Sequence, residues 1–562
     1  MSYDWLPHYA PVGGSVLVGW DAVVGSLGRF GQVVAIDGPA VLDWAGLRRG
    51  LGESFARRDQ PVEFIDTRDW FAAWPEILSR TESRSLLEDP DFAPIPEATL
   101  SQFFDALPRV SDSPAGATVV YGPGSALVEH EVLWYADLPK RYAEEAVGRS
   151  EATNLGAPQE IPPTSRRLLF VDWPVLDRHR DAISPRIDLY VDTQSPEEPH
   201  ALDGWTLRHT SAELARRPFR TRPTFNSLPW GGHWAQRELH VREEARNSAL
   251  GYELIAPEAG VLIGESAAVA VEVPLQLLVA QFPSSTLGSR VHEIFGTSFP
   301  IRFDYLDTLD GGNLSVHCHP QPSYMRSVFG YPYPEHESYY VMVGSKQNRV
   351  FLGLKGDVDV SGFERDARLA DTRGVSFDIH RYVQSHPAEP HGLFMIPAGT
   401  PHGSGAGNVV LEISATPYLY SLRFYDWLRQ DIDGSQRPVH VSHAFANLNR
   451  NLSGPSVRQE LIQEPRSLSS GPGWREELLG RLPGVFFEVR RLVLEGGAAP
   501  SDTGAGVHVL NVVEGSAALV ETSGGEFPVN YAETIIVPSG VGPYRVRPLD
   551  TERVRVVKAL VR

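Results

Sequence analysis

Three histidines and one glutamate stand at positions from which they could bind one metal ion. The first two histidines belong to the run Leu314–His319, which alternates apolar and polar residues as a half-buried strand does. Residues two apart in a strand project from the same face, so His317 and His319 should point into one pocket while Cys318 points the other way.

The other two candidate ligands follow later in the chain. Glu337 opens a run, Ser338–Val343, whose aromatic and β-branched residues favour a strand. His402 comes just after an apolar run that ends in the turn Pro397-Ala398-Gly399. Three imidazoles and one carboxylate suit Zn2+, and iron, manganese and cobalt accept the same ligands. We therefore expect one metal ion per chain, with zinc as the first choice.

Length and composition indicate a multidomain protein rich in turns. The chain has 562 residues, too many for a single core, so two to four domains are expected. Its 51 glycines and 45 prolines favour β-rich architecture. The net charge of −19 argues against nucleic acid as a partner, because phosphate backbones require a basic surface. A small phosphorylated ligand remains compatible, since one pocket can be basic on an acidic protein.

The expected location is the cytoplasm. Cys318 is the one cysteine of the chain, so an internal disulfide is impossible and a reducing compartment fits. The first residues lack the basic head and apolar core of a signal peptide. No apolar run approaches the roughly 20 residues that span a bilayer, so no membrane association is expected.

Residues 1–200 alternate short apolar runs with helical spacing, which predicts a parallel α/β sheet. The expected strands are 32–36, 118–121, 132–135, 168–171 and 187–191. The turn Asp37-Gly38-Pro39 stands where a nucleotide kinase carries its phosphate loop, but the residues that follow lack the lysine and hydroxyl of that loop. The segment resembles a P-loop kinase-like domain that has lost its phosphate grip, so we expect a structural or regulatory role.

Three further units are expected after a polar linker at residues 193–204. The metal-binding barrel should span residues 217–430, and a connector with helical patches should follow at 431–482. A last β unit, 483–562, should form a second barrel. In that unit His508 stands alone and Tyr544 occupies the place where a histidine would be required, so this barrel should hold no metal.

Taken in order, the motifs resemble a known family. His-x-His, a glutamate and Pro-x-Gly-x-x-His form the two-part signature of cupin (jelly-roll) barrels. Residues 217–562 resemble the class I, cupin-type mannose-6-phosphate isomerases, in a long bacterial form with an added N-terminal region; the motifs are Pro229–Gly232, Leu314–Pro320, Glu337–Val341, Val350–Lys355, Ile396–His402, Val410–Glu412 and Arg423–Asp426. The fold expected for the whole chain is thus the α/β domain followed by mainly β cupin barrels. The resemblance implies a zinc-dependent aldose–ketose isomerase that interconverts mannose 6-phosphate and fructose 6-phosphate.

The resemblance also implies roles for single residues. The four metal ligands fall on the residues named above. Ser315 matches a position near the substrate phosphate, Arg423 an arginine that helps to stabilise the enediolate, and Glu412 a carboxylate that lines the pocket and could act as the base.

Two positions depart from the family pattern. His317 stands where a glutamine is usual; it is a stronger zinc ligand, so metal binding survives while metal preference can shift. Glu335 stands where many members carry a lysine, two residues before the glutamate ligand. We expect another cation to replace that lysine, and Lys355 is the candidate.

Four alternatives stay open at this level. The first is isomerisation of a different sugar. The second is a sugar-phosphate sensor without turnover, which fits Glu335 and the altered phosphate loop. The third is an iron oxygenase, which three histidines and a glutamate disfavour because few coordination positions remain for oxygen and a cosubstrate. The fourth, kinase activity of the N-terminal domain, is disfavoured by the missing lysine.

Overall fold

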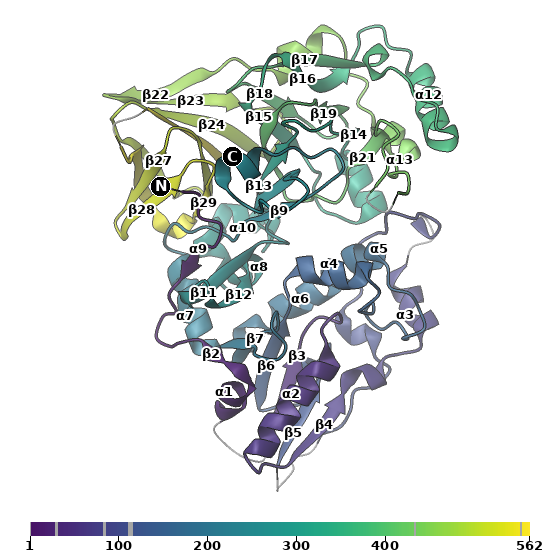
Figure 1. Cartoon of the computed structure of the whole chain (residues 1–562), viewed down its shortest axis with the longest axis vertical. Helices are drawn as coiled ribbons and strands as arrows, with labels where there is room; N and C mark the ends of the chain where they lie inside the picture. Colours follow the sequence, from purple (N-terminus) through teal and green to yellow (C-terminus); the bar gives the residue numbers. More distant parts are fainter. Residues whose placement is uncertain (1, 28–31, 83–85, 111–115, 432–433, 551–552) are drawn as a thin grey trace.

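The structure is a computed structural model that describes residues 2–27, 32–82, 86–110, 116–431, 434–550 and 553–562. The strands of these residues form six β-sheets. The N-terminal α/β part lies at one end of the molecule, and the remaining sheets fill the other (Figure 1). None of the described helices has the length and apolar character needed to cross a membrane.

The N-terminal part contains a seven-stranded sheet in which five neighbouring strands run parallel. Strand β3 (Val33–Asp37), the middle one of the five parallel strands, is buried at every position, as expected for a sheet covered on both faces. The strand order is β2 (Leu17–Val18), β8 (His200–Asp203), β7 (Leu189–Asp192), β6 (Val132–Asp137), β3 (Val33–Asp37), β5 (Ala117–Tyr121) and β4 (Val62–Asp66). The helices of this part include α1 (Gly19–Gly25), α2 (Trp44–Arg57), α3 (Trp74–Thr81), α4 (Lys140–Gly148) and α6 (Trp173–Ile183).

Two expectations for this part were wrong. Residues 168–171, expected as a strand, belong to a π-helical turn, Leu168–Asp172, that leads into α6. A short apolar run alone does not distinguish a buried strand from a buried helix. The expected linker at 193–204 contains strand β8, and Asp203 caps α7 (Gly204–Leu214) by accepting a hydrogen bond from Thr206 N.

Two sheets hold the predicted metal ligands. The first has the order β18 (Leu393–Ile396), β15 (Glu337–Val343), β20 (Val409–Ala415), β13 (Ile301–Asp307), β10 (Leu250–Leu254) and β9 (Thr224–Asn226). The second has the order β17 (Val383–Ala388), β16 (Ser345–Leu354), β19 (His402–Ser404), β14 (Val316–Cys318) and β21 (Leu422–Tyr425). Helices α12 (Val360–Arg373) and α13 (Val441–Asn447) lie beside the second sheet (Figure 1).

The last part of the chain forms two more sheets. The first has the order β22 (Arg466–Gly471), β23 (Trp474–Gly480), β24 (Phe487–Leu494), β31 (Val554–Val561), β26 (His508–Glu514) and β29 (Thr534–Val537). The second has the order β25 (Ala499–Asp502), β30 (Pro543–Pro548), β27 (Ala517–Thr522) and β28 (Gly525–Asn530). The connector is therefore helical only in its first half, at α13 and Val457–Leu461, because β22 and β23 already pair with the last β unit.

A small sheet lies between the N-terminal part and the barrels. Strand β1 (His8–Tyr9) pairs with the hairpin β11 (Gly260–Ser266) and β12 (Val269–Pro274), which is followed by α8 (Leu275–Gln281), α9 (Pro283–Leu287) and α10 (Ser289–Phe295). One hydrophobic cluster runs from Leu133 of the α/β sheet through Val261 of the hairpin to Val489 of the last unit. Because these parts share a core, the hairpin connects the α/β domain firmly to the barrels.

Candidate metal centre

Three of the four candidate ligands come from the second barrel sheet and one from the first. His317 on β14 lies opposite His402 on β19, while Glu337 begins β15. His319 follows directly after β14. One ligand atom from each of the four residues lies within 4.8 Å of the others, and all four side chains are buried. The structure thus brings the predicted ligands together.

Backbone carbonyls orient two of the imidazoles. Nδ1 of His317 lies 3.0 Å from the carbonyl oxygen of Ser315, and Nδ1 of His402 lies 2.8 Å from that of Thr400. Each Nδ1 therefore carries the proton that it donates, which leaves the Nε2 lone pair free for a metal. Burial, assisted by the neighbouring His402 and His319, holds the pKa of His317 well below its usual range, so the ring is neutral as a ligand must be.

His319 provides the test of whether a cation fits. Its Nε2 lies 3.0 Å from Oε1 of Glu337 and its Nδ1 2.9 Å from Oε2 of Glu335, yet neither nitrogen has a hydrogen-bond partner of good geometry among the described residues. Burial opposes a charge on His319, but the two carboxylates raise its pKa well above the usual range. The surroundings of His319 therefore favour a positive charge, and a divalent ion bound there would satisfy both the imidazole ring and Glu337.

An arginine that the sequence analysis missed joins the carboxylates. Arg302 on β13 donates from Nη1 to Glu335 Oε1 (2.8 Å) and from Nη2 to Glu337 Oε1 (3.2 Å), and it also contacts Glu412. Its Nε donates to Asp304 at 3.1 Å. Arg302 and Asp304 are two residues apart on β13, so their side chains lie on the same face of the strand. The buried arginine thus offsets part of the negative charge around the ligands.

The metal group opens onto a pocket that contains most of the predicted site residues. Its lining residues, all in the described part of the chain, include Ser315, His317, Glu337, Glu412 and Arg423, together with Arg302, Asp304, Tyr339, Tyr418, Ser421 and Arg437. Ser315 is buried, and its hydroxyl lies 3.3 Å from Nδ1 of His317.

Lys355, the cation suggested by the sequence, lies outside this pocket. It follows the end of β16, is exposed to solvent and is absent from the lining of this pocket. The cation nearest the departure at Glu335 is Arg302 instead. The sequence predicted part of strand β16, but it did not show which end of the strand lies near the metal site.

Arg423 and Glu412 lie on opposite sheets of the pocket. Arg423 on β21 is the strand partner of His317, and its Nη1 donates to the carbonyl of Pro438 at 3.0 Å. Burial, with Arg437 nearby, lowers the pKa of Arg423 to about 10, so the group stays cationic at neutral pH. Burial and then the charge of Asp304 raise the pKa of Glu412 well above its usual range.

Fold and site together define a β-barrel metal-binding protein whose pocket holds a carboxylate and an arginine beside the ligands. The comparisons agree with this class. The chain is 23% identical over 261 residues to the mannose-6-phosphate isomerase ManA of Bacillus subtilis, covering 45% of this chain and 74% of the relative. It is 26% identical over 223 residues to the mannose-6-phosphate isomerase of Streptococcus mutans, covering 38% of this chain and 63% of the relative. Over somewhat less than half its length the chain is therefore homologous to mannose-6-phosphate isomerases.

Two further similarities complete the comparison. The crystal structure of the mannose 6-phosphate isomerase from Bacillus subtilis matches with a TM-score of 0.49 at 16% identity, covering 62% of this chain and all of that one. Residues 19–216 match a family described as a domain of unknown function, DUF8485.

Proposed function

We propose that the chain is a metal-dependent aldose–ketose isomerase that interconverts mannose 6-phosphate and fructose 6-phosphate. The observation that carries the proposal is the cluster of four buried ligands, two of which, His317 and Glu337, line one pocket with Glu412 and Arg423. Homology to isomerases that are named for mannose 6-phosphate supports the choice of sugar.

His317, His319, Glu337 and His402 would hold the metal, for which the three nitrogens and one oxygen favour zinc. When bound, zinc polarises sugar oxygens and so acidifies the adjacent C–H bond. His317 and His402 contribute rings whose Nδ1–H groups donate to backbone carbonyls, and Glu337 contributes the negative charge.

The pocket residues would move the proton and hold the charge. Glu412 acts as the base that carries a proton between C1 and C2 of the open-chain sugar. Arg302 contacts this carboxylate, and the Ser414 hydroxyl donates to it at 3.0 Å, so its position is fixed. Arg423 supplies a fixed positive charge for the enediolate oxygens. Ser315, next to His317, contributes a hydroxyl to substrate binding.

A coupled assay tests this function. Zinc-loaded protein is expected to convert mannose 6-phosphate to fructose 6-phosphate, and a chelator should abolish the rate. The variant His402→Ala should lose both metal and activity, because it removes one of four ligands. Full metal content and full rate in this variant would overturn the ligand assignment. Binding of mannose 6-phosphate without turnover would favour a sensor, and turnover of another sugar phosphate would change the substrate.

For the N-terminal part we propose a kinase-like domain that has lost its phosphate site. Its parallel strands have the order β4-β5-β3-β6-β7, with the first strand in the centre. The Asp37 carboxylate at the end of β3 accepts hydrogen bonds from the backbone N–H groups of Gly38 (2.8 Å), Gly124 (3.2 Å) and Ala126 (2.9 Å). Asp43 similarly caps α2 at Gly46 N. The Asp37 and Asp43 carboxylates thus occupy the N–H groups of Gly38 and Gly46 at the β3–α2 junction, where a phosphate loop presents its amides, so we expect no ATP hydrolysis from this domain.

A further inference from the structure

A segment of the N-terminal domain reaches the back of the strands that carry the candidate active site. We call this segment, residues 86–95, the docking segment. Asp89 orders it internally, since Oδ1 accepts hydrogen bonds from the backbone N–H groups of Asp91 (2.9 Å) and Phe92 (2.8 Å). Arg166, which precedes α6, donates from Nε to the carbonyl of Phe92 at 2.8 Å. The segment is therefore held by its own domain before it touches the barrel.

Phe92 is the apolar contact of the docking segment. It is buried, and its ring centroid lies 5.3 Å from that of Phe329 and 4.8 Å from the ring of His440. It also stacks on Tyr420 at 6.4 Å. The same hydrophobic cluster includes Val316 and Leu422, on β14 and β21. The docking segment thus forms part of the core behind the two strands that present His317 and Arg423.

A chain of polar contacts connects Asp91 to the pocket arginine. Oδ2 of Asp91 lies 3.4 Å from Nε2 of His440. Nδ1 of His440 accepts a hydrogen bond from the backbone N–H of Arg423 at 3.2 Å, and the backbone N–H of His440 donates to the carbonyl of Arg423 at 2.8 Å. Because Nδ1 is the acceptor, Nε2 carries the proton and faces the carboxylate. His440 therefore fixes both backbone groups of Arg423, and Asp91 orients His440.

A second contact supports the same helix. Oδ2 of Asp89 lies 2.7 Å from Nε2 of His443 on α13, and Nδ1 of His443 lies 2.6 Å from the hydroxyl of Tyr324. Helix α13 begins one residue after His440. Asp89 and Asp91 thus hold the two histidines at the start of α13, directly behind β21.

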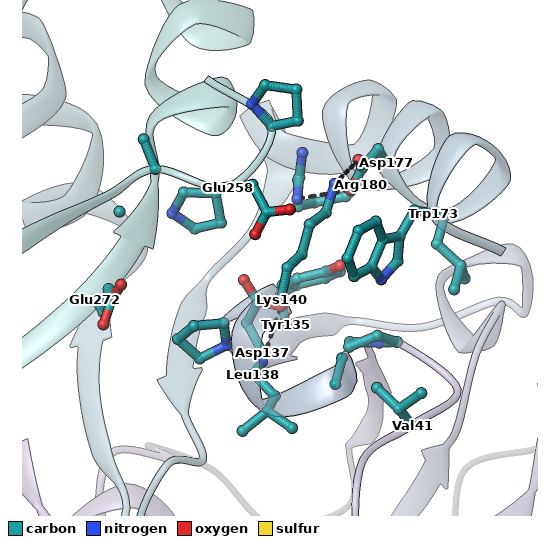
Figure 2. Close-up of a pocket in the computed structure, with 18 residues that line it drawn as sticks. Val41, Tyr135, Asp137, Leu138, Lys140, Trp173, Asp177, Arg180, Glu258 and Glu272 are labelled. Carbon is teal, nitrogen blue, oxygen red and sulfur yellow. Dashed lines mark hydrogen bonds and ion pairs between the residues drawn. The ribbon is translucent and has the colours of Figure 1, made fainter. Parts of the chain in front are cut away.

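The N-terminal domain also approaches the opposite end of this pocket wall. Tyr418, which lines the metal pocket, donates its hydroxyl to Glu258. Glu258 faces the N-terminal domain across a small pocket, where Lys140, Asp177 and Arg180 lie on the other side (Figure 2). There Lys140 Nζ donates to Asp177 at 2.6 Å and Arg180 pairs with the same carboxylate at 3.0 Å. The N-terminal domain therefore contacts one end of the wall formed by residues 418–423 through the docking segment and faces the other end across this small pocket.

We propose that the N-terminal domain is a positioning domain for the isomerase pocket. Its docking segment holds Arg423 in position through His440, and its Lys140 lies across a small pocket from Glu258, which accepts the hydrogen bond of Tyr418. The inference rests on the proposed function. Residues 19–216 match the domain of unknown function. The role proposed for them is to hold one wall of a pocket whose metal ligands all lie outside this domain. Asp91 and Phe92 act through Arg423 and are positioning residues.

The test compares Asp91→Ala and Phe92→Ala with two controls in the same domain. Asp69→Ala removes an exposed carboxylate, and Leu87→Ala removes an apolar side chain of the docking segment that is 56% exposed. In Asp91→Ala and Phe92→Ala, kcat/KM for mannose 6-phosphate should fall by about tenfold, comparable to the loss of one hydrogen bond to a charged group. Zinc affinity should stay at the wild-type value in Asp91→Ala, because this carboxylate contacts His440 and none of the four metal ligands.

Values of kcat/KM equal to those of the controls would overturn the proposal. So would a loss of zinc affinity in step with activity in Asp91→Ala, which would indicate general disruption of the barrel. Asp91→Glu, which keeps the carboxylate, should recover part of the rate. If the wild-type chain binds mannose 6-phosphate without turnover, the isomerase function fails alone, and positioning is then measured as about a tenfold rise in Kd by calorimetry. A wild-type chain that neither binds nor converts this sugar would overturn both.

Discussion

Oε2 of Glu335 lies 2.9 Å from Nδ1 of His319, on the side of the ring opposite the nitrogen that faces Glu337. The resemblance to isomerases led us to expect that a glutamate here removes a useful cation. The structure instead places this carboxylate behind a candidate metal ligand, where it can orient the imidazole and increase its basicity. Arg302, 2.8 Å from the other oxygen of Glu335, balances its charge.

Replacing Glu335 should therefore weaken metal binding. In Glu335→Gln, zinc affinity is expected to fall by roughly 10- to 100-fold, the usual effect of losing an outer carboxylate partner of a ligating histidine. Competition with a chromophoric chelator measures this directly, without reference to turnover. Glu364→Gln, on the outer helix α12, is the matched control and should bind zinc as the wild type does. Unchanged affinity in Glu335→Gln would remove Glu335 from the metal site.

The two cations proposed from the sequence should now behave differently. Arg423→Lys keeps the charge but loses the planar group that lies in the pocket, so kcat should fall by about 100-fold. Lys355→Met should leave kcat and KM at their wild-type values, because this lysine is exposed outside the pocket. Steady-state kinetics with mannose 6-phosphate decide both. A large loss in Lys355→Met would show that the pocket extends further than its described lining.

His508 predicts how stability depends on pH. It is buried, with Nδ1 2.8 Å from the hydroxyl of Tyr544, and burial, reinforced by Lys558 and Arg490, lowers its pKa to about 3. Unfolded histidine titrates near pH 6.5, so between about pH 6.5 and 3 only the unfolded chain binds this proton. The free energy of unfolding should therefore fall as the pH falls through this range, by at most about 1.4 kcal/mol per pH unit from this residue.

Urea unfolding at pH 5 and pH 7.5 measures that dependence. His508→Gln should flatten it, since the neutral amide does not titrate. His209→Gln, which changes an exposed histidine, should leave the slope unchanged. An equal slope in His508→Gln and the wild type would mean that His508 stays accessible to protons in the folded state.

The metal centre could be predicted largely because its residues obey local rules. The two-residue spacing of His317 and His319 fixes a common strand face, and the turn at Pro397–Gly399 delivers His402 beside them. The apolar runs of the parallel sheet were also visible, because strands buried on both faces are continuously apolar. The run 168–171 was wrongly predicted as a strand for the same reason, since a buried helical turn can be as continuously apolar as a buried strand.

What the sequence could not predict depends on contacts between distant residues. Arg302 and Asp304 stand two apart in the chain, but nothing in the sequence shows that their strand face points at Glu335 and Glu412. Likewise, nothing local to the docking segment indicates that Asp91 meets His440, because the two are joined only by the packing of two domains.

The most direct test of the account is isomerisation of mannose 6-phosphate in deuterated water, followed by NMR, with the zinc-loaded and the metal-free chain. Transfer of a proton by Glu412 through an enediolate predicts fructose 6-phosphate that carries solvent deuterium at C1, formed only by the zinc-loaded protein. A zinc-loaded chain with one ion bound that forms no fructose 6-phosphate, or a metal-free chain that forms it equally fast, would contradict the central claim.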